Sequence, residues 1–158
     1  MKKYSIILLS VLLLLLFGCA SDAQDEVIPN DSVVEQEVVP VVSVLAEEDI
    51  ASAEAFGKAY MEAWKAEDWC ISLAVLDSVY NPELTAFYAT NYLNFRSEWT
   101  REYMAENFIV VTVQYECELD HNLIFYPDGK CCINMFIVRE NADAPWEYWD
   151  SEGIHEMT

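Results

Sequence analysis

Basic residues are scarce in this sequence of 158 residues, in which eight Lys and Arg stand against 28 Asp and Glu. The formal net charge is −20, and a field of that sign repels nucleic-acid phosphates and anionic lipid headgroups. The composition therefore argues against a nucleic-acid partner. We interpret the acidic surface first as a source of solubility. It also suits a cationic partner, such as a basic protein, a polyamine or a divalent ion.

Residues that usually carry catalysis are rare or follow no pattern. Of the two histidines, His121 lies beside Asp120 in a predicted turn, and His155 lies past the last predicted strand. Adjacent turn residues usually point into solvent, so we do not expect a general-base pair there. No two carboxylates stand out as a glycosidase pair, and no EF-hand calcium loop is present. The sequence therefore predicts no catalytic residue, no metal and no cofactor.

The N-terminal apolar run is too short to cross a membrane. It extends from Ile6 to Phe17, about twelve residues, whereas a helix needs ~20 to span the hydrocarbon core. Lys2 and Lys3 precede the run, and Gly18 supplies the small residue that a signal peptidase needs before its cut. Residues 1–18 are therefore predicted to be a signal peptide that is removed.

The end of this run, Leu16-Phe17-Gly18-Cys19, resembles the lipobox of bacterial lipoproteins. Phe17 is bulkier than the residue usual at its position. The resemblance implies that the Cys19 thiol is diacylated, that the chain is cut before Cys19, and that the new amino terminus can be acylated too. Two acyl chains anchor a protein stably. We therefore expect lipid attachment at Cys19 and an extracytoplasmic location at the bacterial cell membrane.

The segment from Ala20 to Ala46 differs in composition from the rest. It has no Lys, Arg or aromatic residue and is rich in Asp, Glu, Ser, Gln and Val. Such a segment buries too little apolar surface to offset the entropy of ordering it. We therefore predict a lipidated acidic tether over residues 19–46 and one folded domain over residues 47–158. As an alternative, Val38–Val44 docks on the domain as an additional strand.

Helical patterns dominate the first half of the predicted domain. Apolar residues at intervals of three and four between residues 50 and 64 predict an amphipathic helix. The same spacing predicts a short second helix over residues 69–80, and Asn81-Pro82 is a typical start for a third. Residues 95–103 fit a helix or a strand, because Phe95, Ser97 and Trp99 also alternate.

Strand patterns dominate the second half. Residues 109–119 alternate between apolar and polar side chains, which predicts a strand with one buried face. Predicted strands over residues 123–126 and 130–139 flank Pro127-Asp128-Gly129, a typical tight turn with a left-handed glycine. A last strand begins at Trp146. Helices followed by an antiparallel meander predict an α+β fold.

The order of these elements resembles the nuclear-transport-factor-2-like superfamily, in particular its small lipoprotein branch. The first predicted helix ends in Ala66-Glu67-Asp68, and the last strand reads Trp-x-Tyr-x-Asp-x-x-Gly from Trp146 to Gly153. The resemblance implies N-terminal helices packed on a curved antiparallel sheet that forms a cone. It also favours a strand over residues 95–103. Trp149 departs from the pattern of the last strand.

The cone of that superfamily encloses a pocket in which some members isomerise or dehydrate small molecules. Their Asp–His pair has no matching positions in this chain. The candidate pocket residues are Tyr60, Trp64, Tyr115 and Trp146, although such spacing is also typical of core residues. We therefore predict a lipid-anchored binding or interaction module of the cell envelope, whose partner is either a small-molecule ligand or a basic envelope protein. The alternatives are a small-molecule enzyme with Tyr60, Tyr115 or a buried carboxylate as base, and a structural protein that recruits a basic envelope partner.

Four cysteines follow Cys19, and none has the two-residue gaps typical of zinc sites: Cys70, Cys117, Cys131 and Cys132. An extracytoplasmic compartment permits disulfides. Cys117 and Cys131 are predicted to face the core from two strands, so a disulfide between them is one interpretation. Buried free thiols are the favoured one.

Overall fold

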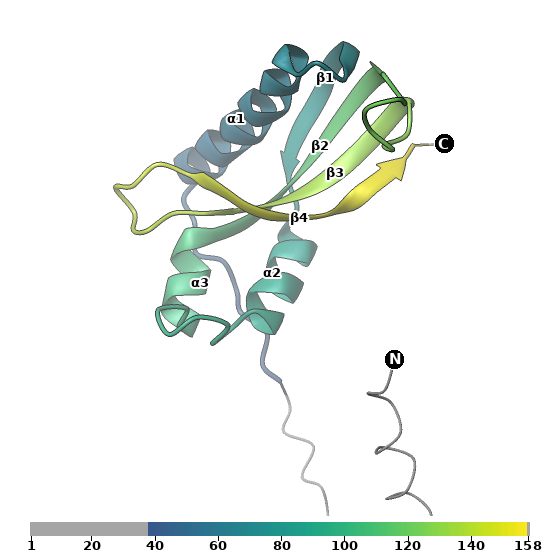
Figure 1. The fold of residues 1–158 in the computed structure, drawn as a ribbon. Coiled ribbons are helices and arrows are strands. Elements are labelled where there is room, and N and C mark those ends of the chain that lie inside the picture. The colour runs from purple at the N-terminus through teal and green to yellow at the C-terminus, as the bar shows by residue number, and fades with distance from the viewer. Residues whose placement is uncertain (1–37, 158) are drawn as a thin grey trace, which may run out of the picture. The chain divides into compact units, whose positions relative to one another are not determined.

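The computed structural model describes residues 38–157. The predictions for the signal peptide and for Cys19 therefore lie outside the described residues. No helix within residues 38–157 is long and apolar enough to cross a membrane. The described part contains three α-helices packed on a four-stranded antiparallel sheet, which confirms the predicted α+β class (Figure 1).

The strands follow one another across the sheet in chain order, β1-β2-β3-β4, and each neighbouring pair is antiparallel. The elements along the chain are α1 (Glu47–Ala63), a 3-10 turn η1 (Trp64–Ala66), β1 (Cys70–Tyr80), α2 (Pro82–Asn91), α3 (Arg101–Asn107), β2 (Phe108–Leu119), β3 (Gly129–Val138) and β4 (Glu147–Glu156).

Helices cover both faces of the sheet, and the alternation along β2 explains why. Val111, Val113 and Tyr115 pack with α1 in one buried cluster. Phe108 and Val110 point to the opposite face and pack with α2 and α3 in a second cluster. Successive residues of a strand face opposite sides. The sheet therefore has α1 on one face, with α2 and α3 at one end of the other (Figure 1).

Helix α1 packs unusually close to the sheet at Gly57. A Cβ at this position would lie 3.1 Å from the Ser78 hydroxyl and 3.2 Å and 3.3 Å from methyl groups of Val111 and Val113. The Ser78 hydroxyl also donates a hydrogen bond to the Glu54 carbonyl at 2.7 Å. The absence of a side chain at Gly57 thus lets α1 sit directly on β1 and β2, as its predicted apolar stripe requires.

The predicted helix over residues 69–80 is wrong, because this segment forms strand β1. The inward side chains of β1 are Leu73 and Val75, and then Ser78 and Tyr80. A register shift between Val75 and Asp77 inserts one residue between these two pairs. A bulge of this kind interrupts the alternation of a strand and gives a three-residue interval that resembles helical spacing.

The predicted strand over residues 95–103 is also wrong. A loop extends to Thr100, and α3 follows. The Thr100 hydroxyl accepts a hydrogen bond from the Tyr103 amide at 3.2 Å, so it caps the helix. The third predicted helix is confirmed as α2, whose cap is Asn81; its side chain accepts from the Leu84 amide at 3.0 Å.

Two corrections concern the C-terminal strands. Residues 123–126 form no strand and belong to a loop over residues 120–128. The predicted left-handed glycine is confirmed, since Gly129 has φ of 86° where β3 begins. The last strand continues further than predicted, and it places His155 opposite Cys132 rather than beyond the sheet.

Residues 38–46, predicted as the end of the tether, pack on the domain without forming a strand. Val41 is 1% exposed, and its amide donates to the Thr90 hydroxyl at 2.8 Å. The Val44 amide donates to the Ala105 carbonyl at 3.0 Å. The folded unit therefore includes residues from Val38 onwards and starts before the predicted boundary at residue 47.

Candidate binding pocket

An aromatic cavity lies on the α1 face of the sheet, where α1 passes into η1. Its volume is about 220 Å³. Its lining comes from the end of α1, from η1, from β3 and β4, and from the loop over residues 120–128. The lining residues are Tyr60, Trp64, Tyr126, Ile133, Tyr148, Ser151, Gly153 and Ile154.

Two pairs of stacked rings form the aromatic wall of this cavity. Tyr60 and Tyr148 stack with centroids 4.6 Å apart and an angle of 14° between their planes. Trp64 and Tyr126 are 6.0 Å apart with an angle of 13°. The Tyr148 hydroxyl donates to the Ser151 hydroxyl at 3.0 Å. Four aromatic side chains from three separate parts of the chain thus converge on one small volume.

Regular structure explains three of the four rings. Tyr60 and Trp64 are four residues apart, which places them on the same side of the helical segment, toward the sheet. Tyr148 pairs with Ile137 in the sheet, and Ile137 is buried in the cluster under α1. Paired residues of neighbouring strands point to the same face, so the Tyr148 side chain faces α1.

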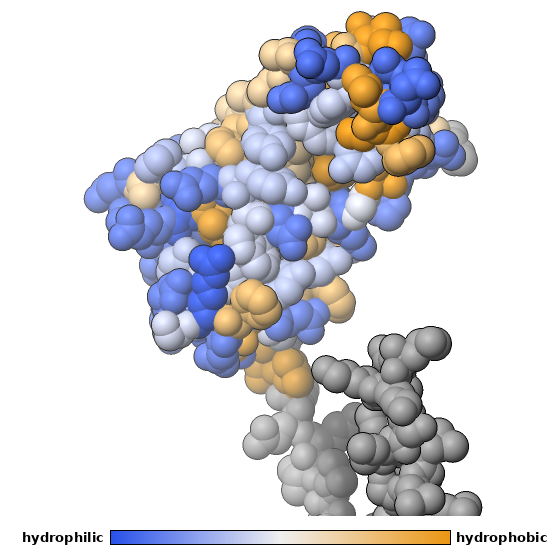
Figure 2. All heavy atoms as spheres, viewed as in Figure 1, coloured by the Kyte–Doolittle hydropathy of each residue, from blue (hydrophilic) through white to orange (hydrophobic). Residues whose placement is uncertain are grey.

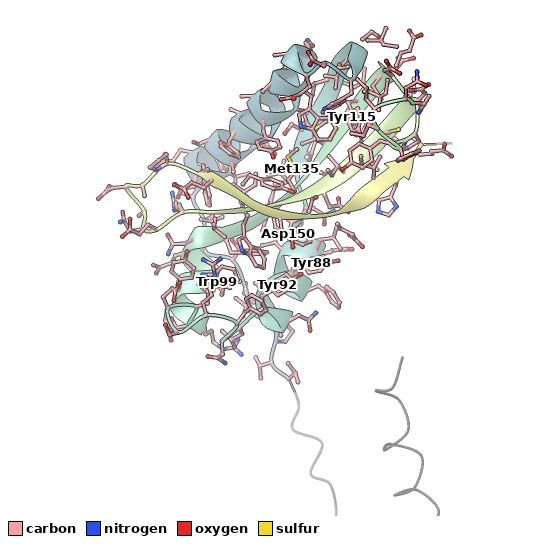
Figure 3. The ribbon with its side chains drawn as sticks, viewed as in Figure 1. Tyr88, Tyr92, Trp99, Tyr115, Met135 and Asp150 are labelled. Atoms are coloured by element: carbon pink, nitrogen blue, oxygen red, sulfur yellow. The ribbon has the colours of Figure 1, made fainter. Side chains whose placement is uncertain are left out.

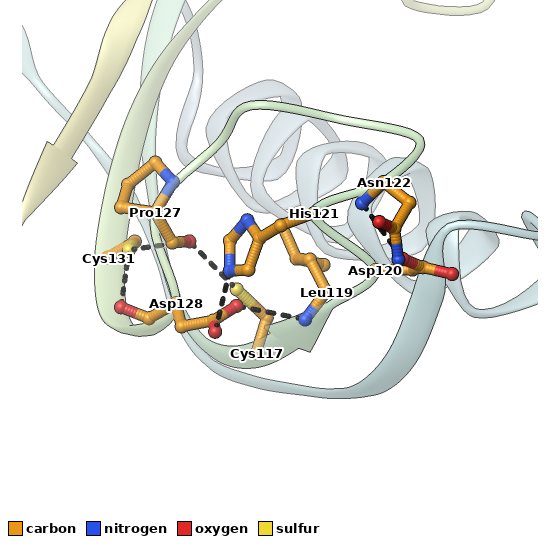
Figure 4. Close-up of polar contacts among 8 residues, drawn as sticks. All are labelled: Cys117, Leu119, Asp120, His121, Asn122, Pro127, Asp128 and Cys131. Carbon is orange, nitrogen blue, oxygen red and sulfur yellow. Dashed lines mark hydrogen bonds and ion pairs between the residues drawn. The ribbon is translucent and has the colours of Figure 1, made fainter.

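The fourth ring, Tyr126, comes from the loop over residues 120–128, which side-chain contacts hold against the ends of β2 and β3 (Figure 4). The Asp128 carboxylate contacts His121 Nε2 at 2.9 Å, and its other oxygen accepts from the Leu119 amide at 2.9 Å. The hydrogen bond to Asp128 raises the pKa of His121 and lowers that of Asp128. The exposed His121 therefore has a positioning role in the loop.

The tip of this loop is apolar as well as exposed. Phe125 is 95% exposed and Leu123 is 60% exposed, although the chain is strongly acidic. Figure 2 shows apolar residues gathered at this end of the molecule. The cavity thus lies beside a loop with exposed apolar side chains.

Tyr115 lies behind the cavity rather than in its lining. It is 1% exposed, and its ring meets Trp64 edge-on at 6.1 Å. Burial raises the pKa of Tyr115 well above its usual value. Burial, followed by the nearby hydroxyls of Tyr148 and Tyr126, also raises the pKa of Tyr60. Both phenols stay protonated at neutral pH, which makes them poor general bases.

Trp146 lies away from the cavity, toward the start of α1. Its ring packs against the Arg139 guanidinium, 4.6 Å from the ring centroid. Arg139 is buried and donates to Asp49 Oδ1 at the first turn of α1 and to Asn107 Oδ1 at the end of α3. Of the four predicted pocket residues, the structure therefore brings Tyr60 and Trp64 together in the lining, with Tyr115 behind them.

All four described cysteines are free thiols. Cys117 and Cys131 approach the same acceptor, the Pro127 carbonyl, at 3.5 Å and 3.8 Å (Figure 4). Burial and the neighbouring Cys131 thiol raise the pKa of Cys117 to about 12. Such thiols are weak nucleophiles at neutral pH. The structure thus has Cys117 and Cys131 as separate thiols and does not contain the disulfide between them.

A larger cavity, about 490 Å³, lies near Trp99 and Tyr103 at the other end of α1. Its lining carries charges of both signs, from Arg96 and Arg139 and from three glutamates. Arg139 already makes the internal hydrogen bonds described above, and Arg96 lies 5.2 Å from the centre of the Trp99 ring. We regard the smaller aromatic cavity as the better candidate site, because its lining is mainly aromatic and apolar and carries no charge.

Sequence reasoning missed Tyr126 and did not include Tyr148 among the four candidate pocket residues. The alternation along the last strand was the signal that pointed Tyr148 inward. Tyr126 gave no such signal, since it lies in an irregular loop.

The chain matches no protein-family model, no curated protein and no solved structure.

Proposed function

We propose that this chain is a lipid-anchored binding module on the extracytoplasmic side of a bacterial membrane, and that the aromatic cavity is its ligand site. The lipobox-like residues Leu16-Phe17-Gly18-Cys19 support the anchor. The convergence of Tyr60, Trp64, Tyr126 and Tyr148 on one cavity is the observation that carries the binding function. Ligand pockets are typically lined by apolar and aromatic side chains with a few polar groups, and Ser151 supplies such a group here.

An enzymatic use of this cavity has less support. Among the described residues, those that line it include no carboxylate, histidine or lysine. The raised pKa values of Tyr60 and Tyr115 keep both phenols protonated. A proton-transfer reaction needs a base that is deprotonated at the working pH and lies within reach of the substrate. Binding without chemistry therefore fits this lining better than an isomerase or a dehydratase.

We also propose that the domain belongs to the nuclear-transport-factor-2-like folds. The support is a long N-terminal helix on one face of a meandering antiparallel sheet, with an aromatic cavity between the two. In that superfamily the pocket has the same relation to the helix and the sheet. The cone shape is part of this proposal.

The anchor is tested by changing Cys19 to Ala in the full chain, with Cys70→Ala as a matched control. We expect wild type and Cys70→Ala to be processed and to take up a fatty-acid analogue. Cys19→Ala should stay an unlabelled precursor, because it lacks the thiol that receives the lipid. Continued labelling of Cys19→Ala, with cleavage at the same bond, would show that the lipobox interpretation is wrong.

A further inference from the structure

We propose that the cavity lined by Tyr60, Trp64, Tyr126 and Tyr148 binds a small quaternary ammonium group. This inference rests on the proposed binding function and adds the chemical class of the ligand. The faces of aromatic rings carry negative electrostatic potential and attract cations within about 6 Å of the ring centre. Several rings around one small volume are the known way in which proteins recognise quaternary ammonium groups.

The composition of the lining favours this kind of cation over others. No residue lining the cavity, within the described part of the chain, carries a charge. A metal ion or a primary ammonium is strongly hydrated and would lose that hydration without an anionic ligand to replace it. A quaternary ammonium has no N–H donors and is weakly hydrated, so ring faces are sufficient partners.

A carboxylate on the cavity's face of the sheet and the net charge of the chain both have the sign that attracts a cation. Glu156 pairs with the core-facing Cys131, so its side chain lies on the same face of the sheet as the cavity. Burial, followed by the Glu156 carboxylate, raises the pKa of the Cys131 thiol. The nearest lysine in the sequence, Lys65, is paired with Glu62. The whole chain has a formal net charge of −20, which favours cation entry over anion entry.

The size of the cavity limits the ligand to a small group. Its volume of about 220 Å³ is below the range of about 300–1,000 Å³ typical of sites for drug-sized molecules. A trimethylammonium headgroup is small enough for a cavity of this volume. The rest of a larger ligand would have to extend past the loop over residues 120–128, where Tyr126 is 42% exposed.

The direct test compares choline with 3,3-dimethyl-1-butanol, called dimethylbutanol below. In this neutral analogue of choline a tert-butyl group replaces the trimethylammonium group. Both are titrated by calorimetry into the chain that starts at Cys19. We expect choline to bind about tenfold or more tightly than dimethylbutanol, because only the cation interacts with the ring potential. Binding should persist in about 0.5 M NaCl, where ions attracted only to the acidic surface are screened.

Substitutions in the cavity locate the binding. Tyr148→Leu and Tyr126→Leu keep an apolar side chain but remove a ring, so each should weaken choline binding about fivefold or more and leave dimethylbutanol binding nearly unchanged. Tyr126 lies in an exposed loop, so this variant stays informative if Tyr148→Leu does not fold. Tyr92→Leu is the matched control, since Tyr92 lies on the α2 side of the sheet (Figure 3).

The outcomes separate this inference from the binding function on which it rests. Equal affinity for choline and dimethylbutanol, with both lost in Tyr126→Leu, would overturn the cation assignment and leave a neutral apolar site. Choline binding that Tyr126→Leu and Tyr148→Leu do not change would also overturn it, since the cation would then bind elsewhere. Binding of neither molecule at millimolar concentration would count against the cavity as a site for any ligand of this shape.

Discussion

Replacing Val41 by Ala should destabilise the domain, although Val41 lies in the segment that the composition predicts to be a tether. The Val41 side chain packs with α2, α3 and the far face of the sheet, in one cluster with Ala89, Trp99 and Phe136. Arg101 holds the same segment by donating to the carbonyls of Val39 at 2.9 Å and Pro40 at 3.1 Å. These contacts make the segment part of the folded unit.

The expected size follows from the atoms that are removed. Val→Ala removes two methyl groups, each contributing about 0.8 kcal/mol by burial, and leaves a small cavity among fixed neighbours. The loss should therefore be about 2–3 kcal/mol in the free energy of unfolding. Val42 offers a matched control, because it is adjacent in sequence but 72% exposed. Val42→Ala should change the free energy of unfolding by about 0.5 kcal/mol or less.

Urea denaturation of chains that start at Ala20 measures the stability of both variants, with tryptophan fluorescence as the signal for unfolding. The unfolding midpoint should fall for Val41→Ala and stay near wild type for Val42→Ala, with similar slopes. A chain starting at Glu47 should lose about 2 kcal/mol or more, since it lacks the whole segment. Equal, near-zero effects of the two valine substitutions would refute the packing of residues 38–46 and restore the predicted boundary at residue 47.

Two further predictions concern the first turn and the middle of α1. Hydrogen bonding to Arg139 lowers the pKa of Asp49, so this carboxylate stabilises the fold above the unfolded pKa of about 4 and loses that effect as the pH falls through its folded pKa. Urea midpoints should show that Asp49→Asn is less stable than wild type by about 1–3 kcal/mol at pH 7. This difference in stability should narrow toward pH 3, and a difference independent of pH would contradict the ion pair. Thermal denaturation should show Gly57→Leu destabilised by about 1–3 kcal/mol, because the larger side chain overpacks against Val111. Ala59→Leu, on the exposed side of α1, is the control and should have almost no effect. Equal effects of the two substitutions would argue against the close approach of α1 to the sheet at Gly57.

The sequence was sufficient for elements whose pattern is uninterrupted. Residues 111–119 alternate between apolar and polar side chains without a break, and they lie in β2 with their apolar side facing α1. Asn81-Pro82 was a reliable helix start, because the cap is a local interaction between a side chain and a nearby amide. Local signals of this kind need no knowledge of the rest of the fold.

Elsewhere the outcome depended on contacts that no local pattern contains. The bulge near Val75 imitates helical spacing, and only pairing with β2 shows it to be a strand. Trp99 continues an apparent alternation, yet it is buried at the end of a loop, and Thr100 then starts a helix. Long-range packing therefore decided both segments.

In the candidate site too, some residues could be predicted from local patterns and others could not. Tyr60 and Trp64 follow from the amphipathic pattern of α1, which predicts their side of the helix. Trp146 has the same apolar character but packs with Arg139 at the other end of α1, a partnership that spacing does not reveal. Tyr126 lines the cavity from an irregular loop, in which Asp128 contacts His121 and the Leu119 amide.

The most direct test of the aromatic cavity as the binding site is an NMR titration of the isotope-labelled domain with tetramethylammonium. We expect saturable chemical-shift changes at the Trp64 indole and at the amides of Tyr60, Tyr126 and Tyr148, unchanged by about 0.5 M NaCl. Residues at the Trp99 cavity should not shift. Small, unsaturable changes spread over the acidic surface and removed by salt, or changes centred on Trp99, would contradict the assignment of the site.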